Sequence, residues 1–348
     1  MSDISQRKDD HLELAVSGDV GFKRTATLFE QVRLVHDALP ELAMADLDTS
    51  VELMGKRLRA PILIAAMTGG SERAERINKE LAQIAEERGY AFGLGSQRAM
   101  HKHPGKGGTY AVRDVAPSAL VLGNLGLVQA AQMSNEDVRG LVDSVGADAL
   151  CVHLNPAQEL IQEEGDRDFR GGMATLSRLL ELGLRVVVKE TGCGLSGAVA
   201  ARVRALGVEY VDVSGAGGTS WVAVETHRAS EARRPLGHTF WEWGIPTAAS
   251  VALCAPLGFR GIFATGGISS GLDIAKAIAL GASAGGIARK ALQALETGGP
   301  EGARAFFERI ETELRAAMLL TGSRNLAALG RAPRLLGREL ADWLELGA

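Results

Sequence analysis

The chain has 348 residues, of which 46% are hydrophobic, so it can bury a sizeable core in one large domain or two small ones. Its net charge of −4 argues against general binding to nucleic acid or to a membrane surface. Three widely spaced cysteines, Cys151, Cys193 and Cys254, form no CxxC pair and fit a reducing compartment. The N-terminus is charged, and no apolar run approaches about 18 residues. We therefore expect a cytoplasmic protein that contacts neither nucleic acid nor membrane.

From residue 61 onward, short apolar runs alternate with helical patterns. The runs are PILIAAM (61–67), YAFGLGS (90–96), ALVLGN (119–124), ALCVHLN (149–155), RVVVKET (185–191), YVDVSG (210–215), GIFATGG (261–267) and ASAGGIA (282–288). Most are apolar on both alternating faces, as in strands buried within a parallel sheet. Eight such β–α units over about 230 residues predict an α/β fold of the (β/α)8 TIM-barrel type. A doubly wound sheet is the alternative, because it also alternates strands and helices.

The sequence on either side of this repeat predicts a single domain over residues 1–348. Residues 1–60 would form an N-terminal extension, residues 61–300 the barrel core, and residues 301–348 helices that cap the barrel. Residues 221–243 are a polar, arginine-rich insertion between the sixth strand and its helix, and they contain three of the four tryptophans.

Polar residues or glycines follow every predicted strand, at the end where a TIM barrel places its active site. The late strands have glycine-rich ends, namely SGAGGTS (214–220), TGG (265–267) and GIAR (286–289). Such ends commonly bind a phosphate through backbone N–H groups and a helix N-terminus. Tight turns in a glycine-rich chain are the alternative. Because three successive strands share this feature, we predict a phosphate site.

Basic residues occur at two of the strand ends and near the N-terminus. Lys189 directly follows the VVV of the fifth strand, at a barrel mouth where a buried ammonium group needs an anionic partner. A flavin would fit, since a cation beside its N1/C2 carbonyl would stabilise the anionic reduced form; a lysine that reaches solvent is the alternative. Arg98 offers a forked donor suited to phosphate. Arg7 and Lys8 would by default belong to a solvated terminus.

The stretch HLNPAQE (153–159) ends the fourth strand. His153 and Asn155 are two residues apart on a strand and so share one face, although His153 could also be a buried core histidine. Glu159 is a single carboxylate, which is a poor metal site alone. Mg²⁺, however, typically takes one or two carboxylates together with substrate phosphates and waters. The cluster therefore fits a polyanion or a metal, or else a solvated turn.

With these motifs in place, the chain resembles the type 2, FMN-dependent isopentenyl-diphosphate isomerases. The matching stretches are RKDDH (7–11), AAMTGG (65–70), GSQR (95–98), GNLG (123–126), HLNPAQE (153–159), VVKETGCG (187–194), DVSGAGGTSW (212–221), ATGGISSGLDIAKAIALGA (264–282) and TGSRN (321–325). They follow one another in order along most of the chain. Many relatives have Ala-Gly where this chain has Ala288 and Arg289, so Arg289 could either add a phosphate contact or point away.

The resemblance implies a set of binding residues. FMN would be held by Ala66, Met67, Thr68, Ser96, Asn124, Lys189, Ser214 and Thr219, with its phosphate near Gly267, Ile268, Ser269, Ala288 and Arg289. The substrate diphosphate would be bound by Arg7, Lys8, Ser96, Gln97, Arg98, His153, Asn155 and Gln158. Glu159 would bind Mg²⁺, and Trp221 would pack near the isoprenoid carbons. NADPH as reductant and a homo-tetramer or homo-octamer are also implied.

The implied reaction interconverts isopentenyl and dimethylallyl diphosphate by a redox-neutral 1,3-proton shift. Reduced FMN would itself be the acid–base group, so no side chain is assigned as the catalyst, and Lys189, His153 and Trp221 would support it. One alternative is an FMN barrel oxidoreductase, which would need a dedicated base or a catalytic cysteine, for which Cys193 is the nearest candidate. The other is a non-catalytic protein that binds a phosphate ligand and needs no flavin.

Overall fold

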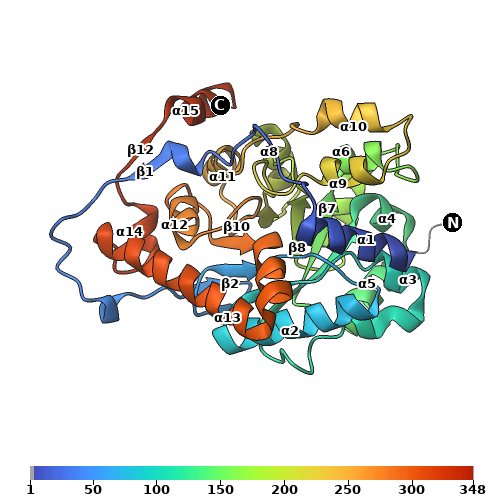
Figure 1. The fold of residues 1–348 in the computed structure, drawn as a ribbon, viewed down its shortest axis with the longest axis horizontal. Coiled ribbons are helices and arrows are strands. Elements are labelled where there is room, and N and C mark those ends of the chain that lie inside the picture. Colours follow the sequence, from blue (N-terminus) through green and yellow to red (C-terminus); the bar gives the residue numbers. More distant parts are fainter. Residues whose placement is uncertain (1–3, 348) are drawn as a thin grey trace.

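The computed structural model describes the backbone of residues 4–347 and the side chains of residues 10–347 except those at 17 and 104. Its centre is a closed barrel of eight parallel strands in the order β10-β11-β4-β5-β6-β7-β8-β9 (Figure 1). These strands are β4 (Ile62–Ile64), β5 (Ala91–Gly93), β6 (Leu120–Gly126), β7 (Ala149–Leu154), β8 (Val186–Glu190), β9 (Tyr210–Asp212), β10 (Gly261–Ala264) and β11 (Ala284–Ile287). All eight predicted strands are confirmed, and the closed barrel excludes the doubly wound sheet.

Helices connect the strands around the outside of the barrel (Figure 1). They are α2 (Glu72–Arg88), α3 (Arg98–Lys102), α4 (Leu127–Gln132), α5 (Asn135–Ser144), α6 (Pro156–Ile161), α7 (Gly172–Glu181), α8 (Gly197–Ala205), α11 (Thr247–Cys254) and α12 (Gly271–Ala279), with the 3₁₀ turns η3 (Pro104–Tyr110) and η4 (Ala255–Leu257). Several begin at a serine that caps the first turn; the Ser71 hydroxyl, for example, accepts from the Ala74 N–H. In α2 the helical period buries Ile77, Leu81 and Ile84 against the barrel.

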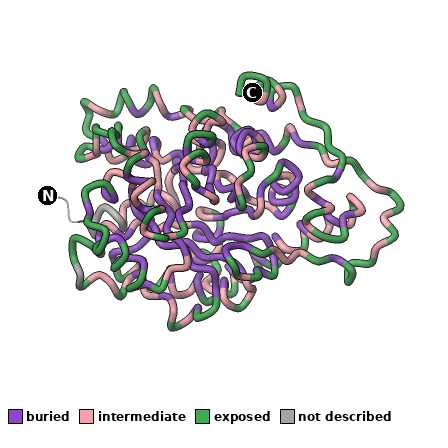
Figure 2. The backbone as a smooth tube through the Cα atoms, turned by 180° about the vertical axis from the view of Figure 1, so that it is seen from behind, coloured by how far each residue is buried: buried purple, intermediate pink, exposed green. Residues whose placement is uncertain are grey.

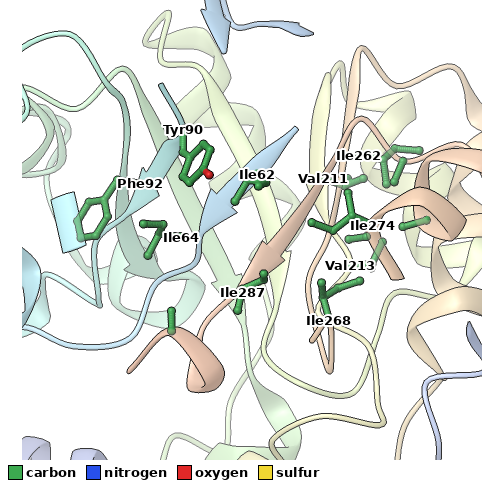
Figure 3. Packing of buried hydrophobic residues seen from close by; sticks show 14 of the residues in the cluster. Ile62, Ile64, Tyr90, Phe92, Val211, Val213, Ile262, Ile268, Ile274 and Ile287 are labelled. Atoms are coloured by element: carbon green, nitrogen blue, oxygen red, sulfur yellow. The ribbon is translucent and has the colours of Figure 1, made fainter. Parts of the chain in front are cut away.

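The two-residue repeat of the strands separates two apolar layers. Ile62, Ile64 and Val211 belong to the outer layer, which packs under the helices; Figure 3 shows them with Ile274 of α12. The alternate residues fill the barrel interior, among them Leu63, Cys151, Val187 and Phe263. Towards the carboxyl ends of the strands, the same inward-facing alternation places polar residues in the interior, namely Asn124, His153, Lys189, Asp212 and Thr265. The same alternation that builds the core therefore turns these polar side chains into the mouth of the barrel.

A hairpin of β2 (Val51–Leu53) and β3 (Lys56–Leu58) covers the opposite end of the barrel. Leu53, Met54 and Leu58 belong to the same apolar cluster as the barrel interior. Leu53 lies beside Gly261, the first residue of β10. The amino-terminal end of the barrel is therefore filled with apolar side chains, and the polar mouth is at the carboxyl ends of the strands.

The two terminal regions pair with each other, which the sequence did not predict. β1 (Val32–Leu34) runs antiparallel to β12 (Arg334–Leu336), and the flanking elements are η1 (Phe29–Gln31), η2 (Met44–Asp46), α14 (Leu326–Gly330) and α15 (Arg338–Leu346). The helices expected after residue 300 are present, but β12 was not predicted, because a three-residue exposed strand carries no local periodicity and its partner is distant in sequence. Figure 2 shows exposed backbone along much of the connection that follows β1.

Two further boundaries differ from expectation. α13 (Arg289–Leu320) begins within the predicted barrel core and has a kink where Gly299 takes φ 63° before Pro300. The insertion at 221–243 is helical, forming α9 (Trp221–Arg228) and α10 (Arg234–Phe240).

Near the N-terminus, α1 (Ile4–Ser17) packs against α9 and α13. Across residues 4–347 no helix is long and apolar enough to cross a membrane.

Candidate active site

A cavity of about 500 Å³ opens at the carboxyl ends of the strands. Most residues predicted for a site line it: Ala66, Met67, Ser96, Arg98, Asn124, His153, Asn155, Gln158, Glu159, Lys189, Ser214, Thr219, Trp221, Gly267, Ile268, Ser269, Ala288 and Arg289. The barrel thus brings together side chains from all eight strand ends. Helix α1 also contributes, through His11, Leu12 and Ala15.

Two of the predicted residues, Gln97 and Thr68, lie behind this lining. Gln97 lies one layer behind the wall, where its amide donates to the Leu141 carbonyl at 2.8 Å and accepts from the Asn124 N–H at 3.0 Å. Thr68 is also buried behind the lining, and its hydroxyl has no hydrogen-bond partner among the described residues. Arg7 and Lys8 belong to α1, but their side chains fall outside the described residues.

A glycine cradle, formed by Gly217, Gly218, Gly266 and Gly267, makes one end of the cavity. A Cβ added to Gly218 would lie 2.3 Å from the Gly267 nitrogen, and one added to Gly217 would lie 2.3 Å from the Thr27 nitrogen. Gly217 and Gly267 also have φ values of 109° and 78°, which disfavour other residues. The first turn of α13 adjoins this cradle and has no side-chain cap. Closely packed backbone beside an uncapped helix start fits a phosphate group of a cofactor.

Beside the cradle lies a buried ionic network. The Lys189 ammonium is 2.8 Å from Asp212 Oδ2, its partner in the β8–β9 register, and donates to Thr265 Oγ1 at 3.3 Å. The Thr265 hydroxyl donates to Asp212 Oδ1 at 2.5 Å. Lys189 and Asp212 are 8% and 2% exposed, so this pair keeps a cation in the cavity wall that would otherwise be unpaired. The ammonium can donate a further hydrogen bond to an acceptor on a ligand in the cavity.

On the neighbouring strand lies the amide-rich cluster that ends β7, where His153 is the register partner of Lys189. The Asn124 amide oxygen accepts from His153 Nδ1 at 2.8 Å, which fixes the orientation of the imidazole. Asn155 donates to Glu159 Oε1 at 2.9 Å, and the Asp166 N–H donates to Glu159 Oε2 at 2.9 Å. No three His, Cys, Asp or Glu side chains among the described residues are grouped as metal ligands. A cation at Glu159 would therefore need oxygens from a ligand.

A further group of polar residues, centred on Glu225 of α9, was not predicted from the sequence. Glu225 is 1% exposed and accepts from Gln158 at 3.1 Å and from Arg228 at 2.7 Å, while His11 Nε2 lies 3.1 Å from its Oε1. Burial alone would raise the pKa of Glu225, but its bonds to His11 and Gln158 and the charge on Arg228 lower it to about 2. The His11 ring also meets Trp221 edge-on at 5.4 Å. The sequence of the insertion at 221–243 does not indicate that Glu225 is buried, because its burial depends on packing of α9 against α1 and α6.

Cys193, the cysteine nearest the mouth, is half-buried and is not among the residues that line the cavity. Burial and the neighbouring Glu190 carboxylate raise the pKa of the Cys193 thiol. The backbone N–H groups of Cys193 and Gly194 donate to the Glu190 carboxylate, the latter at 3.0 Å. A thiol held in its neutral form is a poor nucleophile, so this geometry does not support a cysteine-dependent reaction.

Similarity to known proteins defines the class. Residues 2–102 and 173–335 match the family described as FMN-dependent dehydrogenase. The fold also resembles a mandelate oxidase bound to (S)-2-phenylpropionate, with a TM-score of 0.65, 20% identity, and coverage of 95% of this chain and 98% of the other. A lactate oxidase from Pediococcus acidilactici gives a TM-score of 0.67 at 16% identity, covering 95% of this chain and 93% of the other. The chain is therefore an FMN-dependent barrel of the dehydrogenase class.

Within this class the sequence relatives are more specific. The chain is 43% identical over 343 residues to the isopentenyl-diphosphate delta-isomerase of Methanothermobacter thermautotrophicus, covering 98% of this chain and 96% of the relative. It is 45% identical over 339 residues to the protein of the same name from Synechococcus sp., covering 95% and 96%. The chain belongs to the isopentenyl-diphosphate delta-isomerase family.

Proposed function

We propose that this protein interconverts isopentenyl and dimethylallyl diphosphate by a redox-neutral 1,3-proton shift that requires reduced FMN and Mg²⁺. One observation carries the proposal: a single cavity combines one half, a glycine cradle and a buried lysine, with a second half, an amide- and imidazole-rich cluster on the strand next to that lysine. The first half suits a flavin and its phosphate, and the second suits a diphosphate. A protein that only bound a phosphate ligand would have no need of both halves.

The cradle and the strand ends around it would hold FMN. Gly267, Ile268, Ser269 and Ala288 would surround its phosphate, and Lys189 would lie beside the ring. When bound, reduced FMN supplies acid–base chemistry for an isolated alkene, a base too weak for ordinary side-chain acids. The Lys189 ammonium, held in place by Asp212, would favour the anionic form of the ring.

The cluster at the end of β7 would bind and orient the substrate. Arg98, His153, Asn155 and Gln158 would donate hydrogen bonds to the diphosphate, and Glu159 would bind Mg²⁺ together with phosphate oxygens. Gln97 would act from behind, by fixing the backbone of Asn124. Binding energy at the diphosphate would hold the apolar carbons against the flavin, with Trp221 beside them.

The remaining assignments follow from the family resemblance and are part of the proposal. Arg7 and Lys8 would close over the diphosphate from α1. NADPH would be the reductant, and the protein would assemble as a homo-tetramer or homo-octamer in the cytoplasm.

An anaerobic assay with isopentenyl diphosphate, FMN, Mg²⁺ and a reductant tests this proposal. We expect dimethylallyl diphosphate only when all four components are present, and no product with oxidised FMN in air. A purified protein with no flavin absorption that also fails to take up FMN would instead indicate a simple phosphate-ligand binder. Product formed without FMN would contradict the assigned role of the cradle and Lys189.

A further inference from the structure

Arg289, the first residue of α13, joins two parts of the cavity that the chain separates by more than 270 residues. Its Nε donates to the Ala15 carbonyl at 2.8 Å, and its Nη2 donates to the Gly18 carbonyl at 2.7 Å. One turn further along α13, Gln293 donates to the Val16 carbonyl at 3.0 Å. Together these donors satisfy carbonyls at the C-terminal end of α1, which a helix otherwise leaves unpaired.

The same arginine lines the cavity and lies beside the segment that follows α1. Its Nη1 lies 3.8 Å from the position of a Cβ on Gly21, in the segment that follows α1. That segment pairs with the cradle loop, because the Phe22 N–H donates to the Gly218 carbonyl at 3.2 Å. Gly218 in turn packs against Gly267. Arg289 therefore lies between the end of α1 and the place where the cofactor phosphate would bind.

The positive charge of Arg289 is favourable beside one helix end and unfavourable beside another. A cation is favourable at the C-terminal end of α1 but unfavourable at the N-terminus of its own helix, α13. An anion at the start of α13 removes this conflict and lets the guanidinium bridge both sides through its separate donors. Lysine, with a single ammonium group, could not maintain the two carbonyl bonds and a phosphate contact in the same geometry.

Helix α1 is the element that carries Arg7 and Lys8, and it lines the cavity through His11, Leu12 and Ala15. Its middle has a second attachment, since His11 contacts Glu225 and Trp221. That attachment does not involve the cradle. The end held by Arg289 is the part of α1 that this arginine links to the side of the cavity where the cofactor phosphate would bind.

We infer that Arg289 is a positioning residue that couples the cofactor phosphate to α1, so that FMN binding fixes the helix that closes over the substrate. The inference rests on the proposed FMN site, and it adds an order of events: the cofactor binds first and the substrate-binding helix is ordered by it. By reciprocity, a fixed α1 strengthens the binding of FMN by the same factor.

Amide hydrogen exchange of residues 4–17 in the full-length protein tests this coupling without measuring isomerisation. In the wild type, saturating FMN should slow exchange in α1 at least about 10-fold, whereas riboflavin, which lacks the phosphate, should not slow it even at a concentration that fills the ring site. In Arg289→Ala, FMN should bind roughly 10- to 100-fold more weakly. At saturation it should no longer slow exchange in α1.

Gln293→Ala is the matched control, because it removes one cap bond of α1 and leaves the guanidinium in place. Its exchange in α1 should be faster with and without FMN, and the FMN response should persist. The inference is overturned if Arg289→Ala retains the full FMN response, if riboflavin and FMN protect α1 equally, or if α1 of the wild type does not respond. Each of these results can occur whether or not the protein isomerises its substrate.

Discussion

The Lys189–Asp212 ion pair is nearly fully buried, so its two charges depend on each other. Asp212→Asn would leave the ammonium without its counter-charge, and we expect the free energy of unfolding of the FMN-free protein to fall by about 3–5 kcal/mol. Glu209→Gln is the control, since Glu209 pairs with Arg260 where both are exposed, and it should cost less than about 1 kcal/mol. Urea unfolding measures both. Equal losses would show that the buried pair is not needed to keep Lys189 in the wall.

Glu190 should make stability depend on pH. Burial raises its pKa from 4.5 to about 7, despite its bonds from the Cys193 and Gly194 N–H groups. Because the folded state binds this proton more tightly, the resulting stability is fully present below pH 4.5 and is lost as pH rises through 7. We expect wild type to lose up to about 3 kcal/mol in this window relative to Glu190→Gln, which cannot titrate. If the free energies of unfolding of wild type and Glu190→Gln changed equally with pH across this range, Glu190 would not be the titrating group.

Glu159 should recruit Mg²⁺ only together with the substrate. The carboxylate is already held by Asn155 and the Asp166 N–H, and no group of three His, Cys, Asp or Glu side chains forms a metal site among the described residues. Glu159→Gln should therefore raise the Mg²⁺ concentration needed for half-maximal turnover while the Kd for FMN stays unchanged. A titration of turnover with Mg²⁺, beside a flavin titration, separates the two effects. A Mg²⁺ response identical to that of wild type would remove Glu159 from the metal site.

At the scale of the element, α1 is expected to act as the cover of the substrate site. Its residues His11, Leu12 and Ala15 line the cavity, although the sequence around Arg7 and Lys8 by itself indicates only a solvated terminus. Deleting residues 1–8 removes both basic side chains and leaves His11 and the cap at Arg289 in place. KM for isopentenyl diphosphate should rise roughly 10- to 150-fold, the range for losing a charge-assisted contact. The midpoint temperature of thermal unfolding should change little. An unchanged KM would show that Arg7 and Lys8 do not contact the diphosphate.

At the scale of the whole molecule, the barrel strands were predictable because each is a short apolar run bounded by helical patterns, as in RVVVKET at 185–191. The same local signal is missing where structure depends on distant pairing. β12 forms against β1 across the sequence, and α13 begins at Arg289 because the eighth strand ends there, earlier than the predicted core boundary. Local periodicity records burial of one face and carries no information about a partner elsewhere in the chain.

The candidate site was predictable to the extent that it lies at strand ends. Lys189, His153 and Asn124 follow from the two-residue repeat of their strands. Asp212 could also have been predicted, because it lies two positions before Ser214 on the strand next to Lys189 and so faces the same side of the sheet. Glu225 was not, because it depends on how α9 folds back against α1 and α6. The inner wall of the cavity is thus determined by strands, and its cover by tertiary packing.

In the proposed reaction, reduced flavin is required but not consumed. The measurement is the amount of NADPH or dithionite oxidised against the amount of dimethylallyl diphosphate formed, under anaerobic conditions and over many turnovers. We expect one reduction to support many turnovers and, in deuterated water, deuterium to enter the methyl group formed from the terminal alkene carbon. Lys189→Ala should lower turnover more than it weakens flavin binding, because the charge acts on the reduced ring. A sustained one-to-one ratio of reductant to product would contradict the isomerase and indicate an oxidoreductase.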